Sequence, residues 1–99
     1  MNYHQGDIIL RKREKPIPQT AKKIRKDIVA FGEATGHSHR IKDCDIFIDE
    51  KEPFEMVRCN IANPMVHDEH PQTDIVEVGD YDRIRQYEYF PEGDLEVKD

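Results

Sequence analysis

The stretch 44–62, CDIFIDEKEPFEMVRCNIA, decides the fold class of this chain. Apolar and polar residues alternate in its first half, and they alternate again after the break KEP. A period of two residues is typical of half-buried β-strands, whose side chains point to opposite faces in turn. The apolar side chains of each half are therefore expected on one face of a strand: Cys44, Ile46 and Ile48 in the first, Val57, Cys59 and Ile61 in the second.

Further strand-like runs flank this stretch at 7–13, 27–41 and 74–90, separated by glycine and proline. Roughly six or seven short strands with frequent turn signals predict an all-β domain, built as a small barrel or a sandwich. We expect this single domain to cover residues 1–90 and a polar tail to cover 91–99. The segment 17–28, IPQTAKKIRKDI, is the best helical candidate, so at most one short helix is expected.

The composition favours a cytoplasmic protein without a membrane segment. The chain has 99 residues, of which 36% are hydrophobic and 36% charged. No apolar run approaches the roughly 20 residues needed to span a bilayer, and the start lacks the order of a signal peptide. Cys44 and Cys59 alternate with Ile or Val, so both are expected as buried free thiols in a reducing compartment.

The charge is divided unevenly along the chain. Residues 1–42 contain ten Lys or Arg against four Asp or Glu, whereas 43–99 contain five against seventeen. A self-complementary surface of this kind favours homo-oligomers, although two differently charged edges of one domain would give the same count. Both explanations stay open.

Four of the five histidines lie in two close pairs, His37 with His39 and His67 with His70. Residues i and i+2 of a strand share a face, so the first pair is a ready two-point chelate, and it faces inward with Val29 and Phe31 if residues 29–41 form one unbroken strand. In the second pair, HDEH, Pro71 disfavours a helix, and a turn at 68–69 could direct both rings the same way.

These pairs predict a site for one divalent transition metal, with His37, His39, His67 and His70 as ligands. Zinc, iron, manganese, nickel and copper all suit imidazole ligands, and the sequence does not choose among them. An open position could take a small-molecule ligand or activate water, in which case Glu69 is the first candidate for acid–base catalysis. Whether the domain is an enzyme is left open, and the isolated His4 is expected to be structural or at the surface.

Two family resemblances accompany these motifs. The stretches GEATGHSHRI, HDEH and RQYEY resemble those of small uncharacterised bacterial and phage-encoded proteins over most of residues 5–91. The H-x-H pair with a later His also resembles the cupins, which implies a metal inside a β-barrel. The chain departs from cupins because it has no Glu shortly after H-x-H and no second cupin motif.

Two alternatives compete with the metal-binding hypothesis. The first is a non-enzymatic interaction or assembly module that uses the two oppositely charged halves. The second, less favoured, is a single-stranded nucleic-acid binder, because basic and aromatic residues are expected to share one face of the last strand: Tyr81, Arg83, Arg85, Tyr87 and Tyr89.

Overall fold

The computed structural model describes residues 2–32 and 37–86, and within these ranges it contains β-strands but no α-helix. The strands are β1 (Asn2–Gln5), β2 (Ile8–Lys12), β3 (Lys22–Phe31), β4 (Ser38–Ile48), β5 (Glu55–Cys59), β6 (Asn63–Pro64), β7 (Ile75–Val76) and β8 (Gly79–Arg85). The expected all-β class is confirmed. The helix considered at 17–28 is not present, because residues from Lys22 onward pair with β4 and the residues before them form a loop.

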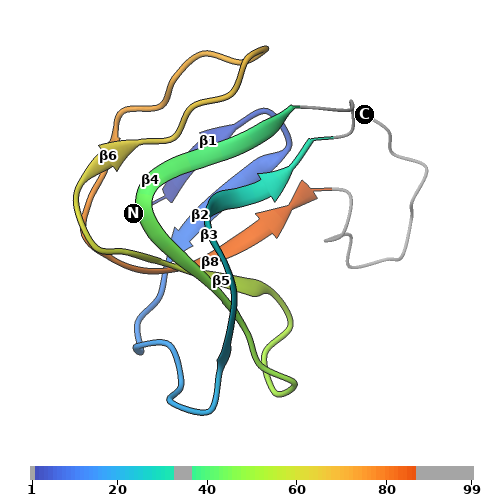
Figure 1. Cartoon of the computed structure of the whole chain (residues 1–99), viewed down its shortest axis with the longest axis vertical. Helices are drawn as coiled ribbons and strands as arrows, with labels where there is room; N and C mark the ends of the chain where they lie inside the picture. The colour runs from blue at the N-terminus through green and yellow to red at the C-terminus, as the bar shows by residue number, and fades with distance from the viewer. Residues whose placement is uncertain (1, 33–36, 87–99) are drawn as a thin grey trace.

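Six strands form an antiparallel sheet in the order β1-β2-β8-β5-β4-β3, and β6 pairs with β7 in a small second sheet. The large sheet is open in the described chain, with β1 and β3 at its edges, so these strands do not close a barrel. The sheet is strongly curved, and the β6–β7 segment lies along one side of it (Figure 1). Of the two expected architectures, barrel and sandwich, the described strands are compatible with the sandwich. No helix in the described residues is long and apolar enough to cross a membrane.

A bend in β4 determines where the first histidine pair lies. Asp43 has a left-handed φ of 61°, and the two halves of β4 on either side of it have different neighbours. The second half pairs with β5, whereas in the first half Arg40 bridges to Val66. The bend therefore directs the start of β4 towards the segment that carries the second histidine pair.

The unbroken strand expected over 29–41 is not present. Phe31 in β3 pairs with Ser38 in β4, so the chain reverses direction between them, and the intervening residues 33–36 lie outside the described residues. Irregular register in β3 also changes which side chains face inward: Val29 is fully buried, whereas Phe31 is 57% exposed. Gly32 and Gly36 are the local signals of a break in the strand, but they do not show that the chain turns back to pair with itself.

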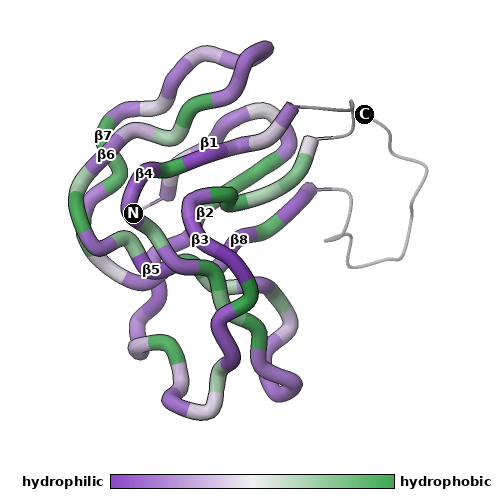
Figure 2. Tube along the Cα trace, viewed as in Figure 1, coloured by the Kyte–Doolittle hydropathy of each residue, from purple (hydrophilic) through white to green (hydrophobic). Residues whose placement is uncertain are grey.

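The core is built from inward-facing residues of the large sheet together with Val76 of β7 and Met65, which directly follows β6. Hydrophobic and hydrophilic residues alternate along the strands, as the green and purple segments of Figure 2 show. The apolar residues expected on one face of β4 and β5 are mostly buried. The exceptions are Ile48, at the end of β4, and Ile61, beyond the end of β5, which are exposed. Each large apolar side chain buried in this way contributes about 1.5–3 kcal/mol to folding.

Cys44 and Cys59 are directly opposite each other on β4 and β5, and both are buried free thiols, as expected. Burial raises the pKa of each thiol to about 12, so both stay protonated at neutral pH. They act as small apolar residues of the core.

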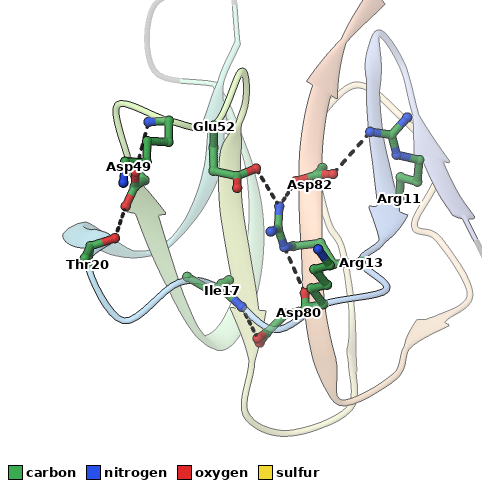
Figure 3. A network of polar contacts seen from close by, with 10 residues as sticks. Arg11, Arg13, Ile17, Thr20, Asp49, Glu52, Asp80 and Asp82 are labelled. Carbon is green, nitrogen blue, oxygen red and sulfur yellow. Dashed lines mark hydrogen bonds and ion pairs between the residues drawn. The ribbon is translucent and has the colours of Figure 1, made fainter.

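A network of arginines and carboxylates lies along β8 (Figure 3). Arg13 donates to Asp82 over 2.6 Å and to Glu52 over 3.2 Å, and Arg11 reaches the other Asp82 oxygen at 3.2 Å. Asp80 accepts from the Ile17 amide over 2.9 Å. The network joins the β2–β3 loop and the β4–β5 turn to the sheet.

Candidate functional site

All four paired histidines lie together at one end of the sheet. His39 is in β4 and His37 just precedes it, whereas His67 and His70 are in the loop between β6 and β7. The ring centroids are 4.4 Å apart for His39 and His67, 5.8 Å for His39 and His70, 4.7 Å for His67 and His70, and 5.7 Å for His37 and His67. The two pairs, separated along the chain, thus form one cluster, which we call the histidine cluster.

His39 is the buried centre of this cluster, and Gln5 determines its tautomer. The Gln5 amide nitrogen donates to the carbonyls of Met65 and Pro71, over 2.8 and 2.9 Å, so its oxygen must face His39. That oxygen lies 2.8 Å from His39 Nδ1. Because an amide oxygen only accepts, Nδ1 carries the hydrogen, and the neutral ring keeps a free electron pair on Nε2.

The surroundings of His39 favour its neutral form. The residue is 1% exposed, and burial, followed by the neighbouring His67, lowers its pKa to about 4. Asp7 acts in the opposite direction, with Oδ1 at 3.8 Å from His39 Nε2, but it does not outweigh the burial. At neutral pH His39 is therefore an uncharged imidazole with its Nε2 electron pair available.

The second pair is held by the expected turn at 68–69. His67 and His70 form an isolated bridge, and the Glu69 amide donates to His67 Nδ1 over 2.9 Å. The hydrogen of a neutral His67 ring is therefore on Nε2. Burial, with His70 and His37 next, lowers the pKa of His67, so this ring too favours its neutral form.

Two glycines leave space for the rings of the second pair. A Cβ at Gly6 would lie 2.6 Å from His70 Nε2, and a Cβ at Gly32 would lie 3.2 Å from His67 Nε2. Gly6 also has a φ of +59°, which L side chains rarely adopt. The β1–β2 turn and the end of β3 are thus shaped to let imidazoles approach the main chain closely.

His37 and Glu69 face each other at the edge of the cluster. His37 Nδ1 lies 3.2 Å from Glu69 Oε2 without hydrogen-bond geometry, and this buried nitrogen has no hydrogen-bond partner in the described residues. The Glu69 side chain is 59% exposed. The acid expected to act in catalysis therefore reaches the cluster from the solvent side.

As the rings stand, no group of three or more His, Cys, Asp or Glu residues in 2–32 and 37–86 is arranged to hold a metal ion. Two features of the rings oppose a shared metal ion in this arrangement. The His67 Nδ1 electron pair accepts a hydrogen bond from the Glu69 amide, and the planes of the His39 and His70 rings are 9° from parallel. Imidazoles around one tetrahedral ion would have centroids about 5 Å apart, given metal–nitrogen distances near 2.0–2.1 Å. The spacing of the rings fits that arrangement, and the orientation of His67 and His70 does not.

The family model described as Domain of unknown function (DUF8820) matches residues 4–86. The chain belongs to this family. The matched region contains all four histidines of the cluster together with Gln5 and Asp7. The expected similarity to an uncharacterised group of proteins is confirmed at this level. No curated protein and no solved structure matches the chain.

The basic and aromatic face expected on the last strand lies only partly within the described ranges. Tyr81 is fully buried and Arg83 and Arg85 are 8% exposed, so this face of β8 is interior. Tyr87 and Tyr89 lie outside the described residues. Arg40, the neighbour of His39 in β4, is exposed and donates to Ser38 Oγ over 2.8 Å.

Sequence reasoning missed Gln5 and Asp7, and it assigned Arg85 to a nucleic-acid-binding face instead of to a contact with Asp7. Arg85 donates to the Phe31 carbonyl and its Nε lies 3.8 Å from Asp7 Oδ2. The only local signal was Gly6, which predicts a tight turn between two polar residues but does not indicate what they face. Their role depends on contacts across at least 32 positions of the chain.

Proposed function

We propose that this domain binds one divalent transition metal at the histidine cluster, with His39 Nε2 as the first ligand. One observation carries the proposal: Gln5 holds the Nδ1 hydrogen of a buried His39 and so presents its Nε2 electron pair to the other rings. Metal-ligating histidines commonly donate their second N–H in this way, and the partner fixes the tautomer and orientation of the ring.

The remaining ligands are His37, His67 and His70. Buried His37 Nδ1 lacks a hydrogen bond among the described residues, so binding a cation would satisfy it. His67 and His70 are on a loop, and ligation requires their rings to rotate and His67 to give up its contact with the Glu69 amide. Because the metal competes with protons for neutral imidazoles, the lowered pKa values of His39 and His67 favour binding at neutral pH.

Chemically, a set of imidazoles with one open position would suit a small-molecule oxygen ligand or a water molecule. Glu69 is exposed on one side and lies beside His37 on the other, so it is placed to exchange protons between solvent and such a ligand. Metal-assisted hydrolysis and oxidation of a small molecule are the two reaction classes that this arrangement would serve.

The test is metal binding by protein purified without a histidine tag and stripped with a chelator. We expect calorimetry with Zn²⁺ and Co²⁺ to give one site per chain, and His39→Ala and His70→Ala to weaken it at least about 100-fold. His4→Ala is the matched control, because His4 is exposed in β1 outside the cluster and should bind as wild type. Equal binding by the His4 and His70 variants, or no saturable binding by wild type, would reject the proposal.

An interaction module is the second candidate. It is favoured by the exposure of large apolar side chains in the second-sheet region, 40–56% for Ile61, Val66, Ile75 and Val78. Patches of this kind often mark contact surfaces, and a homo-oligomer is the simplest partner. Light scattering of wild type and of Val78→Ser would test it, since association through this region should weaken in the variant.

A further inference from the structure

Asp7 occupies an unusual position for a carboxylate. It lies in the turn between β1 and β2, and its Oδ1 is 3.8 Å from His39 Nε2. Gln5 contacts Nδ1 of the His39 ring, so the second ring nitrogen, Nε2, is the one that faces Asp7. A carboxylate oxygen and an imidazole nitrogen, two common ligand types for divalent metals, therefore lie close together, and the Asp7 side chain is 35% exposed.

Asp7 also contacts other parts of the chain, and these contacts hold its turn in place. Asp7 Oδ2 lies 3.8 Å from Arg85 Nε, which balances charge on the far side of the carboxylate, and the Asp7 carbonyl accepts from the Gln86 amide over 2.9 Å. Arg85 itself is anchored to the Phe31 carbonyl. These contacts fix the turn and leave Oδ1 directed at His39.

We propose that Asp7 is an oxygen ligand of the same metal ion that His39 Nε2 binds, so that the site combines histidines with one carboxylate. This inference rests on the proposed function. A cation between Asp7 Oδ1 and His39 Nε2 would accept an electron pair from both atoms, and carboxylate oxygen and imidazole nitrogen are ligands that divalent transition metals commonly combine. The present separation needs to close only slightly for both atoms to reach one ion at about 2.0–2.2 Å.

The β1–β2 turn supplies three parts of the site in consecutive residues. Gln5 orients His39, Gly6 leaves room for the His70 ring, and Asp7 provides the carboxylate. The turn is held by β2 on the sheet and by the Gln5 contacts to Met65 and Pro71 of the loop. Asp7 is therefore fixed in place before any ion binds, and the histidine loop is the part that must adjust.

A ligand set that combines histidines with one carboxylate narrows the range of metal ions that we expect to bind. Carboxylate oxygens favour harder ions and imidazoles suit zinc, iron and nickel, whereas Cu⁺ prefers soft sulfur ligands. One carboxylate also offsets part of a divalent charge in a site that is otherwise neutral. We therefore expect Zn²⁺, Fe²⁺, Mn²⁺ or Co²⁺ to bind in preference to Cu⁺.

The experiment titrates Co²⁺ and Zn²⁺ into the chelator-stripped full chain and into three variants. Asp7→Asn keeps the shape of the side chain and removes its charge, and Asp7→Glu keeps a carboxylate. Asp68→Asn is the matched control, because Asp68 is an exposed acid next to His67 whose loss changes the local charge equally. Circular dichroism of the metal-free proteins checks that each variant is folded.

We expect Asp7→Asn to weaken Co²⁺ and Zn²⁺ binding about 10–100-fold and to change the visible absorption of bound Co²⁺, which reports the ligand set. Asp7→Glu should recover part of that affinity, and Asp68→Asn should stay within about 3-fold of wild type. Wild-type affinity and an unchanged spectrum in Asp7→Asn would overturn the role of Asp7 and leave the histidine site standing. Equal weakening by Asp7→Asn and Asp68→Asn would show a charge effect and would also overturn it. Absence of binding by wild type would reject both proposals.

Discussion

The arginine–carboxylate network along β8 and the histidine cluster are both polar and partly buried, but they differ in how completely their groups are satisfied. In the network each carboxylate faces a donor: Asp82 accepts from Arg11 and Arg13, and Asp80 accepts from Arg58 over 2.9 and 3.1 Å. In the histidine cluster, His39 Nε2 lies 3.8 Å from the Asp7 carboxylate, which is too far for a hydrogen bond.

The two regions also differ in how burial and neighbouring groups change the pKa of their side chains. Burial would raise the pKa of Asp80, but the hydrogen bonds from Arg58 and from the Ile17 amide lower it below its usual value, as expected of a carboxylate that is stabilised by folding. Burial lowers the pKa of His39 to about 4, so folding leaves that base neutral and without a proton on Nε2. The carboxylates of the network have partners within the protein, whereas for the cluster we propose a cation as the partner.

The largest expected effect comes from breaking the network. Asp82→Asn removes the charge that Arg13 and Arg11 share, and the Asp82 and Arg13 side chains are only 12% and 10% exposed. Removing one member of a buried ion pair leaves the charge of the other uncompensated. We therefore expect the free energy of unfolding, measured by urea denaturation, to be about 3 kcal/mol lower than that of wild type. Asp74→Asn, at an exposed acid, is the control and should change stability by less than about 0.5 kcal/mol. Similar losses in both variants would contradict a structural role for the network.

The second effect is a pH dependence of the metal-free protein that originates in His39. The unfolded residue titrates near 6.5 and the folded one near 4, so between these values the unfolded chain binds more protons. The free energy of unfolding should therefore fall by about 2–3 kcal/mol as the pH drops from 6.5 to 4, and this contribution should be constant above 6.5. Denaturation curves across this range measure the loss, and NMR of the His39 ring assigns it. A His39 ring that becomes protonated near pH 6.5 would contradict the described environment.

Gln5→Met should have a smaller effect on stability and a specific effect on His39. The variant leaves the Met65 and Pro71 carbonyls without their amide donor, which we expect to cost about 2 kcal/mol. The nitrogen-15 shifts of His39 should move from the Nδ1–H form to a mixture of tautomers. Gln72→Met, at an exposed glutamine of the same loop, should change neither quantity. An unchanged His39 tautomer in Gln5→Met would remove the main support for the metal site.

The smallest effect is expected at the rim of the network. Arg11 is 45% exposed, and its ion pair with Asp82 spans 3.2 Å. Exposed pairs of this kind contribute up to about 1 kcal/mol and weaken with salt, so Arg11→Gln should destabilise only slightly, and least at high ionic strength. Arg13→Gln provides the comparison, because loss of its buried ion pair should lower the free energy of unfolding several-fold more than Arg11→Gln does. Equal losses would show that exposure does not separate the two arginines.

Much of the fold follows from local pattern. The alternation in 44–62 correctly predicts β4 and β5 and the burial of Cys44 and Cys59, because a strand exposes alternate residues to opposite faces wherever it lies. No helix forms at 17–28, the one segment considered for it, because pairing with β4 overrides weak local propensity in β3; the expectation of at most one short helix holds for the described residues. The barrel alternative could not be tested by local pattern, because closure depends on which strands become neighbours.

For the site, the sequence by itself determined the two close histidine pairs and the turn at 68–69, since these depend on neighbouring residues alone. Only the tertiary structure decided that the pairs meet, through the bend at Asp43 and the bridge from Arg40 to Val66. It also decided that Gln5 and Asp7 face His39. The physical reason is that strand periodicity repeats over two residues, whereas register, bends and side-chain tautomers depend on hydrogen-bond partners supplied from distant parts of the chain.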